Sequence, residues 1–114
     1  MDISPFEPFV AAAVQASPVY LDANATIDKV RSLALESAAN GARLIAFPEV
    51  FVPGYPYWNW TMTPVKGGPW FERLVLASID LDGPEVRRLG SIAKEAAATI
   101  VIGVNERGAH SLGV

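Results

Sequence analysis

The apolar residues of this chain follow two kinds of spacing. Short continuous apolar runs occupy residues 9–15, 44–47 and 99–104, and their length is typical of buried strands. Apolar residues recur at helical spacing from Asn24 to Asn40, and again from Pro84 onward. The pattern therefore predicts strands that alternate with helices.

Several residues mark the ends and the buried faces of these helices. Asn24 is the expected N-cap of the first helix, because its side chain can accept a hydrogen bond from a free backbone N–H. Gly41 follows that helix, at a place where a left-handed residue commonly ends one. The apolar stripe expected on the second helix consists of Val86, Leu89, Ala93 and Ala97.

The stretch from residue 50 to residue 69 is rich in proline, glycine and aromatic residues, which predicts a long loop with tight turns. Loops of this length usually carry function. A short helix is predicted to begin at Pro69, with Phe71 and Leu74 on one face, and to end before the next turn.

Alternating strands and helices predict an α/β fold, in which crossovers join a parallel or mostly parallel sheet that is flanked by helices. The 114 residues fit one domain. Three strands with two crossover helices would leave one sheet edge unpaired and one apolar face uncovered. We therefore expect the chain to associate with itself.

Composition narrows the classes of partner. The chain has 9 basic and 12 acidic residues, a formal charge of -3, and scattered basic residues, which argue against a nucleic-acid partner. No apolar stretch has the length that a bilayer requires, and the N-terminus lacks a secretion signal, so we predict no membrane partner and a cytoplasmic location. With no cysteine and one histidine, His110, a metal site is not expected, and His110 is interpreted as an incidental tail residue.

A carboxylate follows the second predicted strand. Glu49 lies two residues after Phe47, and in open α/β sheets reacting groups gather just beyond the carboxyl ends of the strands. Neighbouring aromatic residues such as Phe51 should bury the acid partly and allow it to serve as a general base near neutral pH. The alternative is an ordinary glutamate on a surface loop.

The segment from Gly41 to Pro56 resembles the nitrilase-type carbon-nitrogen hydrolases, in particular their nitrilase and cyanide hydratase branch. It contains the family's glycine, its Phe-Pro-Glu sequence at residues 47–49 and its Gly-Tyr-Pro sequence at residues 54–56. Such a match over consecutive residues is hard to obtain by chance. Supporting matches are residues 12–16, 24–40 and 102–107.

This resemblance implies that residues 1–114 are the N-terminal part of a carbon-nitrogen hydrolase domain, matched to about residue 107, with 108–114 as a divergent tail. The implied fold is a partial, truncated α-β-β-α sandwich. The implied reaction converts a small-molecule nitrile to a carboxylic acid and ammonia, without metal or organic cofactor. Glu49 is similar to the family's general base, which takes the proton of a cysteine thiol that attacks the nitrile carbon. A lysine stabilises the charge that develops on the covalent intermediate.

The chain departs from the family pattern in its nucleophile. It contains no cysteine, and Lys29, Lys66 and Lys94 do not lie in the family's lysine context. The family places both catalytic residues beyond the strand that ends near Asn105. We therefore predict that the chain alone is inactive on nitriles. The alternative to an enzyme is a truncated remnant, or a module that associates with an intact homologue.

The aromatic loop allows two interpretations. By resemblance, this loop borders the substrate pocket, where its rings could select the organic group of the nitrile. Alternatively, the rings anchor a long loop to the sheet. The residues concerned are Tyr55, Tyr57, Trp58 and Trp60.

Overall fold

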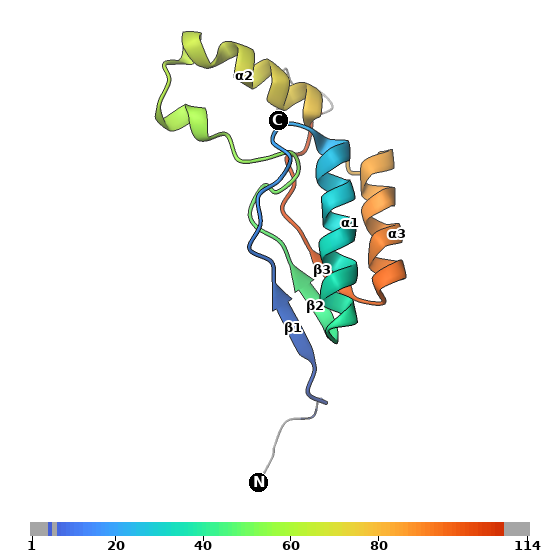
Figure 1. The fold of residues 1–114 in the computed structure, drawn as a ribbon. Helices are drawn as coiled ribbons and strands as arrows, with labels where there is room; N and C mark the ends of the chain where they lie inside the picture. The colour runs from blue at the N-terminus through green and yellow to red at the C-terminus, as the bar shows by residue number, and fades with distance from the viewer. Residues whose placement is uncertain (1–4, 6, 109–114) are drawn as a thin grey trace.

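Three parallel strands form the sheet of this protein. The computed structural model describes residues 5 and 7–108. Strands β1 (Val10–Ala13), β2 (Ala42–Ala46) and β3 (Thr99–Val101) lie side by side in the order β1-β2-β3 (Figure 1). The α/β class and the parallel sheet that the sequence predicts are confirmed.

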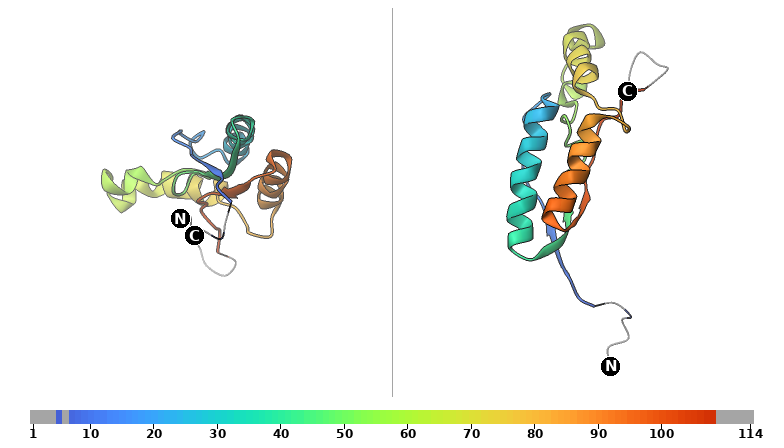
Figure 2. Two further views of the ribbon diagram at one scale, coloured as in Figure 1. Left: turned by 90° about the horizontal axis from the view of Figure 1, so that it is seen from below. Right: turned by 90° about the vertical axis from the view of Figure 1, so that its right-hand side faces the viewer.

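Two helices cover one face of this sheet. Helix α1 (Ala23–Ala39) joins β1 to β2, and helix α3 (Pro84–Ala96) precedes β3. Figures 1 and 2 show the two helices side by side on the same face. The main hydrophobic core lies between these helices and the sheet, so one layer of helices and one layer of strands share it. Its most deeply buried side chains include Ile27, Val30, Ile45, Phe51, Ile79 and Ile92.

The two ends of α1 differ in how well the sequence predicts them. The N-cap is Asp22, not Asn24, and the Asp22 carboxylate accepts a hydrogen bond of 2.9 Å from the Ala25 N–H. Aspartate and asparagine cap helices almost equally well, so residue type could not separate the two positions. At the other end Gly41 has φ +94°, which confirms the predicted left-handed glycine.

Helix α3 buries Leu89, Ile92 and Ala96 against the core. The sequence pattern placed Ala97 in this stripe, and that prediction is wrong: Ala97 is the exposed C-cap and has a left-handed backbone. The outer surfaces of α3 and α1 are joined by two ion pairs between exposed side chains. Such pairs contribute little stability on their own. They are Arg31 with Glu95 and Arg88 with Asp28.

Strand β1 is an exposed edge strand, and the prediction of a buried strand is wrong. It pairs with β2 on one side, and within residues 5 and 7–108 no strand pairs with its other edge. The strand register also shows which side chains point away from α1 and α3, on what we call the open face. No helix covers the open face in the described part of the chain (Figure 2). The open face consists of Ala11, Ala13, Leu44, Ala46, Thr99 and Val101.

The segment after β2 contains more helix than the sequence predicts. A short 3-10 helix, η1 (Tyr57–Trp60), is followed by helix α2 (Pro64–Ala77), so the predicted loop ends earlier and the predicted helix begins before Pro69. Thr63 caps α2 by accepting a hydrogen bond from the Lys66 N–H, and Pro64 occupies the first helical position, where its missing donor costs nothing. Pro69, which the sequence pattern predicted as the start of this helix, therefore lies inside it.

Helix α2 and η1 form an arm that extends from the sheet (Figure 1). A second, smaller core of Leu21, Trp58 and Leu74 joins the arm to the body, with Trp70 stacked on Trp58. None of the helices in the described residues is long and apolar enough to span a membrane.

Candidate functional site

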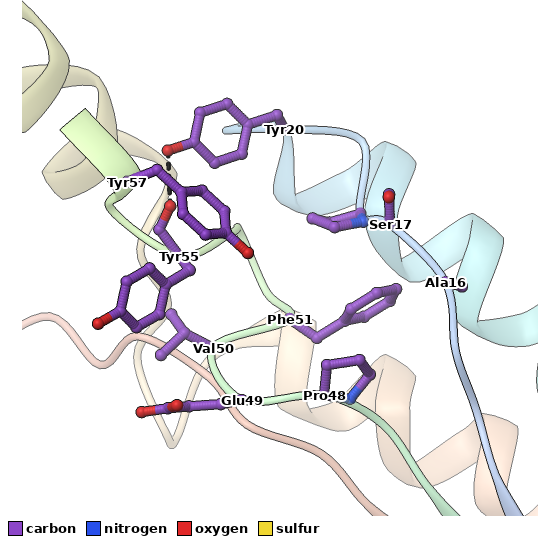
Figure 3. Close-up of a pocket in the computed structure, with 10 residues that line it drawn as sticks. Ala16, Ser17, Tyr20, Pro48, Glu49, Val50, Phe51, Tyr55 and Tyr57 are labelled. Atoms are coloured by element: carbon purple, nitrogen blue, oxygen red, sulfur yellow. Dashed lines mark hydrogen bonds between the residues drawn. The ribbon is translucent and has the colours of Figure 1, made fainter. Parts of the chain in front are cut away.

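Glu49 lies at the carboxyl end of β2, the place predicted for it. The chain leaves β2 at Ala46 and reaches Glu49 three residues later, beside the loop that follows β1. Here Glu49 lines a hollow of about 310 Å³ (Figure 3). The loop after β1 and the turn after β2 meet because parallel strands end at the same edge of the sheet. Other residues that line the hollow are Ala16, Ser17, Tyr20, Phe51, Tyr55 and Tyr57.

The carboxylate is more exposed than the sequence suggests. Glu49 is an exposed residue, so the prediction of a partly buried acid is wrong for the described chain. Its aromatic neighbours Phe47 and Phe51 pack against each other, with ring centroids 5.4 Å apart, and are buried in the core. Figure 3 shows the Glu49 carboxylate pointing away from Phe51. These rings therefore fix the backbone beneath the acid and leave its carboxylate in contact with water.

The backbone around Glu49 is held in an unusual conformation. Val50 has φ +45°, and a β-branched residue rarely adopts this left-handed region. Such a conformation costs about 1–3 kcal/mol and persists only where the surroundings enforce it. The surroundings here include the segment after β3, since the Val52 N–H donates to Gly103 and the Asn105 N–H donates to Val52, at 3.2 and 2.8 Å.

Gly103 lies directly against this turn. A Cβ atom on Gly103 would be 2.4 Å from the Val50 nitrogen and 3.1 Å from the Glu49 Cα atom. Real Cβ atoms do not approach backbone so closely, so only glycine fits. The position of Glu49 thus depends on contact between two backbones.

The four aromatic candidates divide into two groups. Tyr55 and Tyr57 line the hollow together with Glu49, as the substrate-binding interpretation expects. Trp58 is only 7% exposed and belongs to the second core with Leu74, whereas Trp60 is 77% exposed and lies outside the lining of the hollow. The structure therefore brings two of the four residues to Glu49. Trp58 instead fits the alternative interpretation, because it anchors the arm.

Comparison with known proteins decides the lineage of this site. The family model described as carbon-nitrogen hydrolase matches residues 10–112. The chain belongs to the carbon-nitrogen hydrolase family. The matched range includes both loops that form the hollow, so the resemblance noted around Glu49 extends through nearly the whole described chain.

Individual relatives of this carbon-nitrogen hydrolase chain are named as nitrilases or as a cyanide hydratase. An aliphatic nitrilase from Rhodococcus rhodochrous is 46% identical over 91% of this chain and 29% of its own length. A nitrilase from Pseudomonas syringae is 42% identical over 93% of this chain and 32% of its own length. A cyanide hydratase from Armillaria gallica is 41% identical over 91% and 29%. The chain thus spans about a third or less of the length of these relatives.

Asn105 and Arg107, which lie in the matched segment after β3, have a structural role here. The Arg107 guanidinium donates hydrogen bonds to the backbone oxygens of Val75, Leu76 and Ser78 at the end of α2. Asn105 donates from its amide to the Ser78 hydroxyl at 2.9 Å. Arg107 therefore satisfies carbonyls that a helix C-terminus leaves free and places a positive charge where the helix dipole favours one.

Sequence reasoning missed Ser17 and Tyr20, which reach the hollow from the loop after β1. The position of this loop in the sequence could have indicated them. The loop follows a parallel strand that neighbours β2, and such loops converge at one edge of the sheet. The lysines Lys29, Lys66 and Lys94 do not line the hollow. Among the described residues, no group of three His, Asp or Glu side chains is arranged to hold a metal ion. His110 lies outside the described residues.

Proposed function

We propose that this chain supplies the general base of a nitrile-hydrolysing site. The observation that carries the proposal is the position of Glu49, at the tip of β2 and on the rim of a hollow lined by Tyr55 and Tyr57. The relationship to nitrilases and to a cyanide hydratase supports a small nitrile as substrate. The exposed Glu49 carboxylate is sterically accessible to a proton donor in the hollow.

In the proposed reaction, Glu49 accepts the proton of a cysteine thiol while the sulfur attacks the nitrile carbon. The carbon–nitrogen triple bond becomes the double bond of a covalent thioimidate, and the nitrogen takes the proton that Glu49 had accepted. One water molecule displaces nitrogen as ammonia, and a second releases the carboxylic acid and restores the thiol. The family resemblance places the cysteine and a charge-stabilising lysine beyond Asn105, and this chain has no cysteine. Its own contribution is therefore the base and part of the pocket wall.

We expect the chain alone to release no ammonia from nitriles, because no thiol is present to attack them. The purified chain is incubated with aliphatic, aromatic and arylacetic nitriles and with cyanide, and ammonia is measured. Sustained turnover that exceeds the uncatalysed rate would contradict this expectation. The same assay with Glu49→Gln identifies any background that does not involve the acid.

The role of Glu49 is tested in a chimera. Residues 1–107 of this chain replace the matching N-terminal part of the Rhodococcus rhodochrous relative, so that the remainder of a full-length enzyme completes the site. We expect ammonia release from an aliphatic nitrile, and a loss of about 10³-fold in kcat for Glu49→Gln, the size typical of removing a general base. The matched control is Glu72→Gln, because Glu72 is exposed on α2. Equal activity of both variants would reject Glu49 as the base.

A second proposed function, association between copies of this chain, is favoured by the open face. The open face is largely apolar, and Val101 at its edge is 56% exposed. Exposed apolar patches of this kind commonly mark interaction surfaces. We propose that the open face packs against the open face of a second copy, since a symmetric pairing would bury the same patch on both chains.

If two copies associate through the open face, Val101→Lys should raise the dissociation constant of the pair at least tenfold, because a buried and unpaired charge is unfavourable. Sedimentation velocity across a range of concentrations measures the dissociation constant. Leu81→Lys is the control, since Leu81 is 52% exposed in the turn before α3 and is not one of the open-face residues. A monomeric wild type, or equal effects of both variants, would exclude this surface.

A further inference from the structure

Tyr20 connects the two loops that form the hollow. It lies between β1 and α1, and its hydroxyl donates a hydrogen bond of 2.6 Å to the backbone oxygen of Tyr55 (Figure 3). The same oxygen accepts a bond of 2.8 Å from the Tyr57 N–H. A second tie runs from the Leu21 N–H to the oxygen of Pro53, at 3.0 Å. The turn after Glu49 is thus bonded twice to the loop that follows β1.

The Tyr20 ring also fits the shape of this turn. A Cβ atom at Gly54 would be 2.5 Å from the Tyr20 ring, and Gly54 has φ +139°, a conformation that few other residues adopt. The Tyr20 ring centroid lies 6.4 Å from that of Tyr57 and 6.5 Å from that of Trp58. Aromatic rings at such separations attract one another. Tyr20 therefore contacts both the wall of the hollow and the anchor of the arm.

The environment of Tyr20 keeps its hydroxyl a donor. Burial raises the pKa of Tyr20 above its usual value, although the Tyr57 N–H and the charge of Arg73 act in the opposite direction. The hydroxyl is consequently protonated at neutral pH, and its bond to the Tyr55 oxygen persists there.

We infer that Tyr20 is a positioning residue that holds Tyr55 and Tyr57 in place as the wall of the hollow. The inference rests on the proposed function, because it treats the hollow as the place where the organic group of a nitrile binds. Tyr20 acts through the backbone of the turn: its hydroxyl fixes the Tyr55 carbonyl, and its ring fixes Gly54. Without the hydroxyl, the bond from Leu21 to Pro53 would be the one hydrogen bond left between the turn and this loop within the described part of the chain.

The test compares Tyr20→Phe with Tyr57→Phe in the full chain. Each variant removes one hydroxyl from the same wall, but among the described residues only that of Tyr20 makes a hydrogen bond. Two measurements are made by NMR: the backbone amide shifts of residues 54–57, and the affinity for phenylacetonitrile as a probe. We expect Tyr20→Phe to move these amides and to weaken probe binding about fivefold, the equivalent of one neutral hydrogen bond. Tyr57→Phe should leave the amides of Gly54 and Tyr55 unchanged.

Rescue separates positioning from general stability. Replacing Tyr20 with p-aminophenylalanine restores an N–H donor at the same place, so the amide shifts and the probe affinity should return towards the wild-type values. Unchanged amides in Tyr20→Phe, or equal effects of both tyrosine variants, would overturn the inference. If the wild type binds no probe, the proposed function loses its support, while the amide shifts still decide whether Tyr20 holds the turn.

Discussion

Gly103→Ala is expected to lower the free energy of unfolding by about 3 kcal/mol, at the upper end of the usual cost of forcing an atom into packed structure. The added Cβ would lie 2.4 Å from the nitrogen of Val50, and a backbone atom cannot rotate out of the way. The turn that carries Glu49 would have to separate from the segment after β3. Urea unfolding measures the loss, and thermal unfolding should show Tm falling by roughly 12 °C or more.

Gly90→Ala is the matched control for this substitution. Gly90 lies within α3, is exposed, and has open space where a Cβ atom would be placed. Alanine is about 1 kcal/mol better than glycine within a helix, so this variant should be more stable than the wild type. Two glycine-to-alanine changes of opposite sign would attribute the first effect to the contact with Val50. A Gly103→Ala variant as stable as the wild type would show that this contact does not constrain the turn.

Arg107→Met is expected to lower the free energy of unfolding by about 2 kcal/mol, the value of a charge-assisted hydrogen bond to partly buried acceptors. Methionine retains most of the apolar stem but cannot donate to the three carbonyls at the end of α2. Arg107→Lys keeps the charge near the helix C-terminus without the planar group that reaches several acceptors, so its loss should be smaller. Urea unfolding of both variants gives the comparison.

Arg43→Met is the control for the arginine series. Arg43 is exposed on β2, and within the described residues it forms no ion pair with a carboxylate. Its replacement should change the free energy of unfolding by less than about 0.5 kcal/mol, as is usual at the surface. If Arg107→Met were equally neutral, the proposed attachment of α2 through Arg107 would be wrong.

The regular elements follow from sequence because their signals are local and agree with one another. The apolar spacing from Ile27 to Ala38 predicts a helix, and α1 has nearly the expected bounds. The brief apolar run before Pro48 predicts β2 equally well. Whether a strand is buried depends on neighbours, however. The alanines of β1 resemble a core strand, yet β1 is an exposed edge.

The arm was harder to predict because a proline can either begin a helix or interrupt one. Pro64 and Pro69 both suggest interruption, but Pro64 begins α2 and Pro69 is tolerated within it. The N-cap Thr63 was the informative residue. A threonine followed by proline is typical of a helix start, and this pattern competes with the loop signal of the surrounding glycines.

The candidate site shows the same division between local and tertiary information. The position of Glu49 after a strand could be predicted, since strand order and loop position follow from the alternation of elements. The direction of its side chain could not, because Phe51 turns into the core and does not cover the acid. The contribution of Tyr20 depends on a hydrogen bond to Tyr55, which is distant along the chain, and no local pattern encodes it.

The left-handed valine next to Glu49 sets the stability of the chain against precise placement of the Glu49 carboxylate. Glycine at position 50 would relax the turn and remove a conformational penalty, but it would also let the neighbouring acid sample more directions. Selection for a more durable chain would therefore favour a residue that holds the proposed base less firmly. A valine at position 50 thus gives the chain a more rigid turn at the expense of stability.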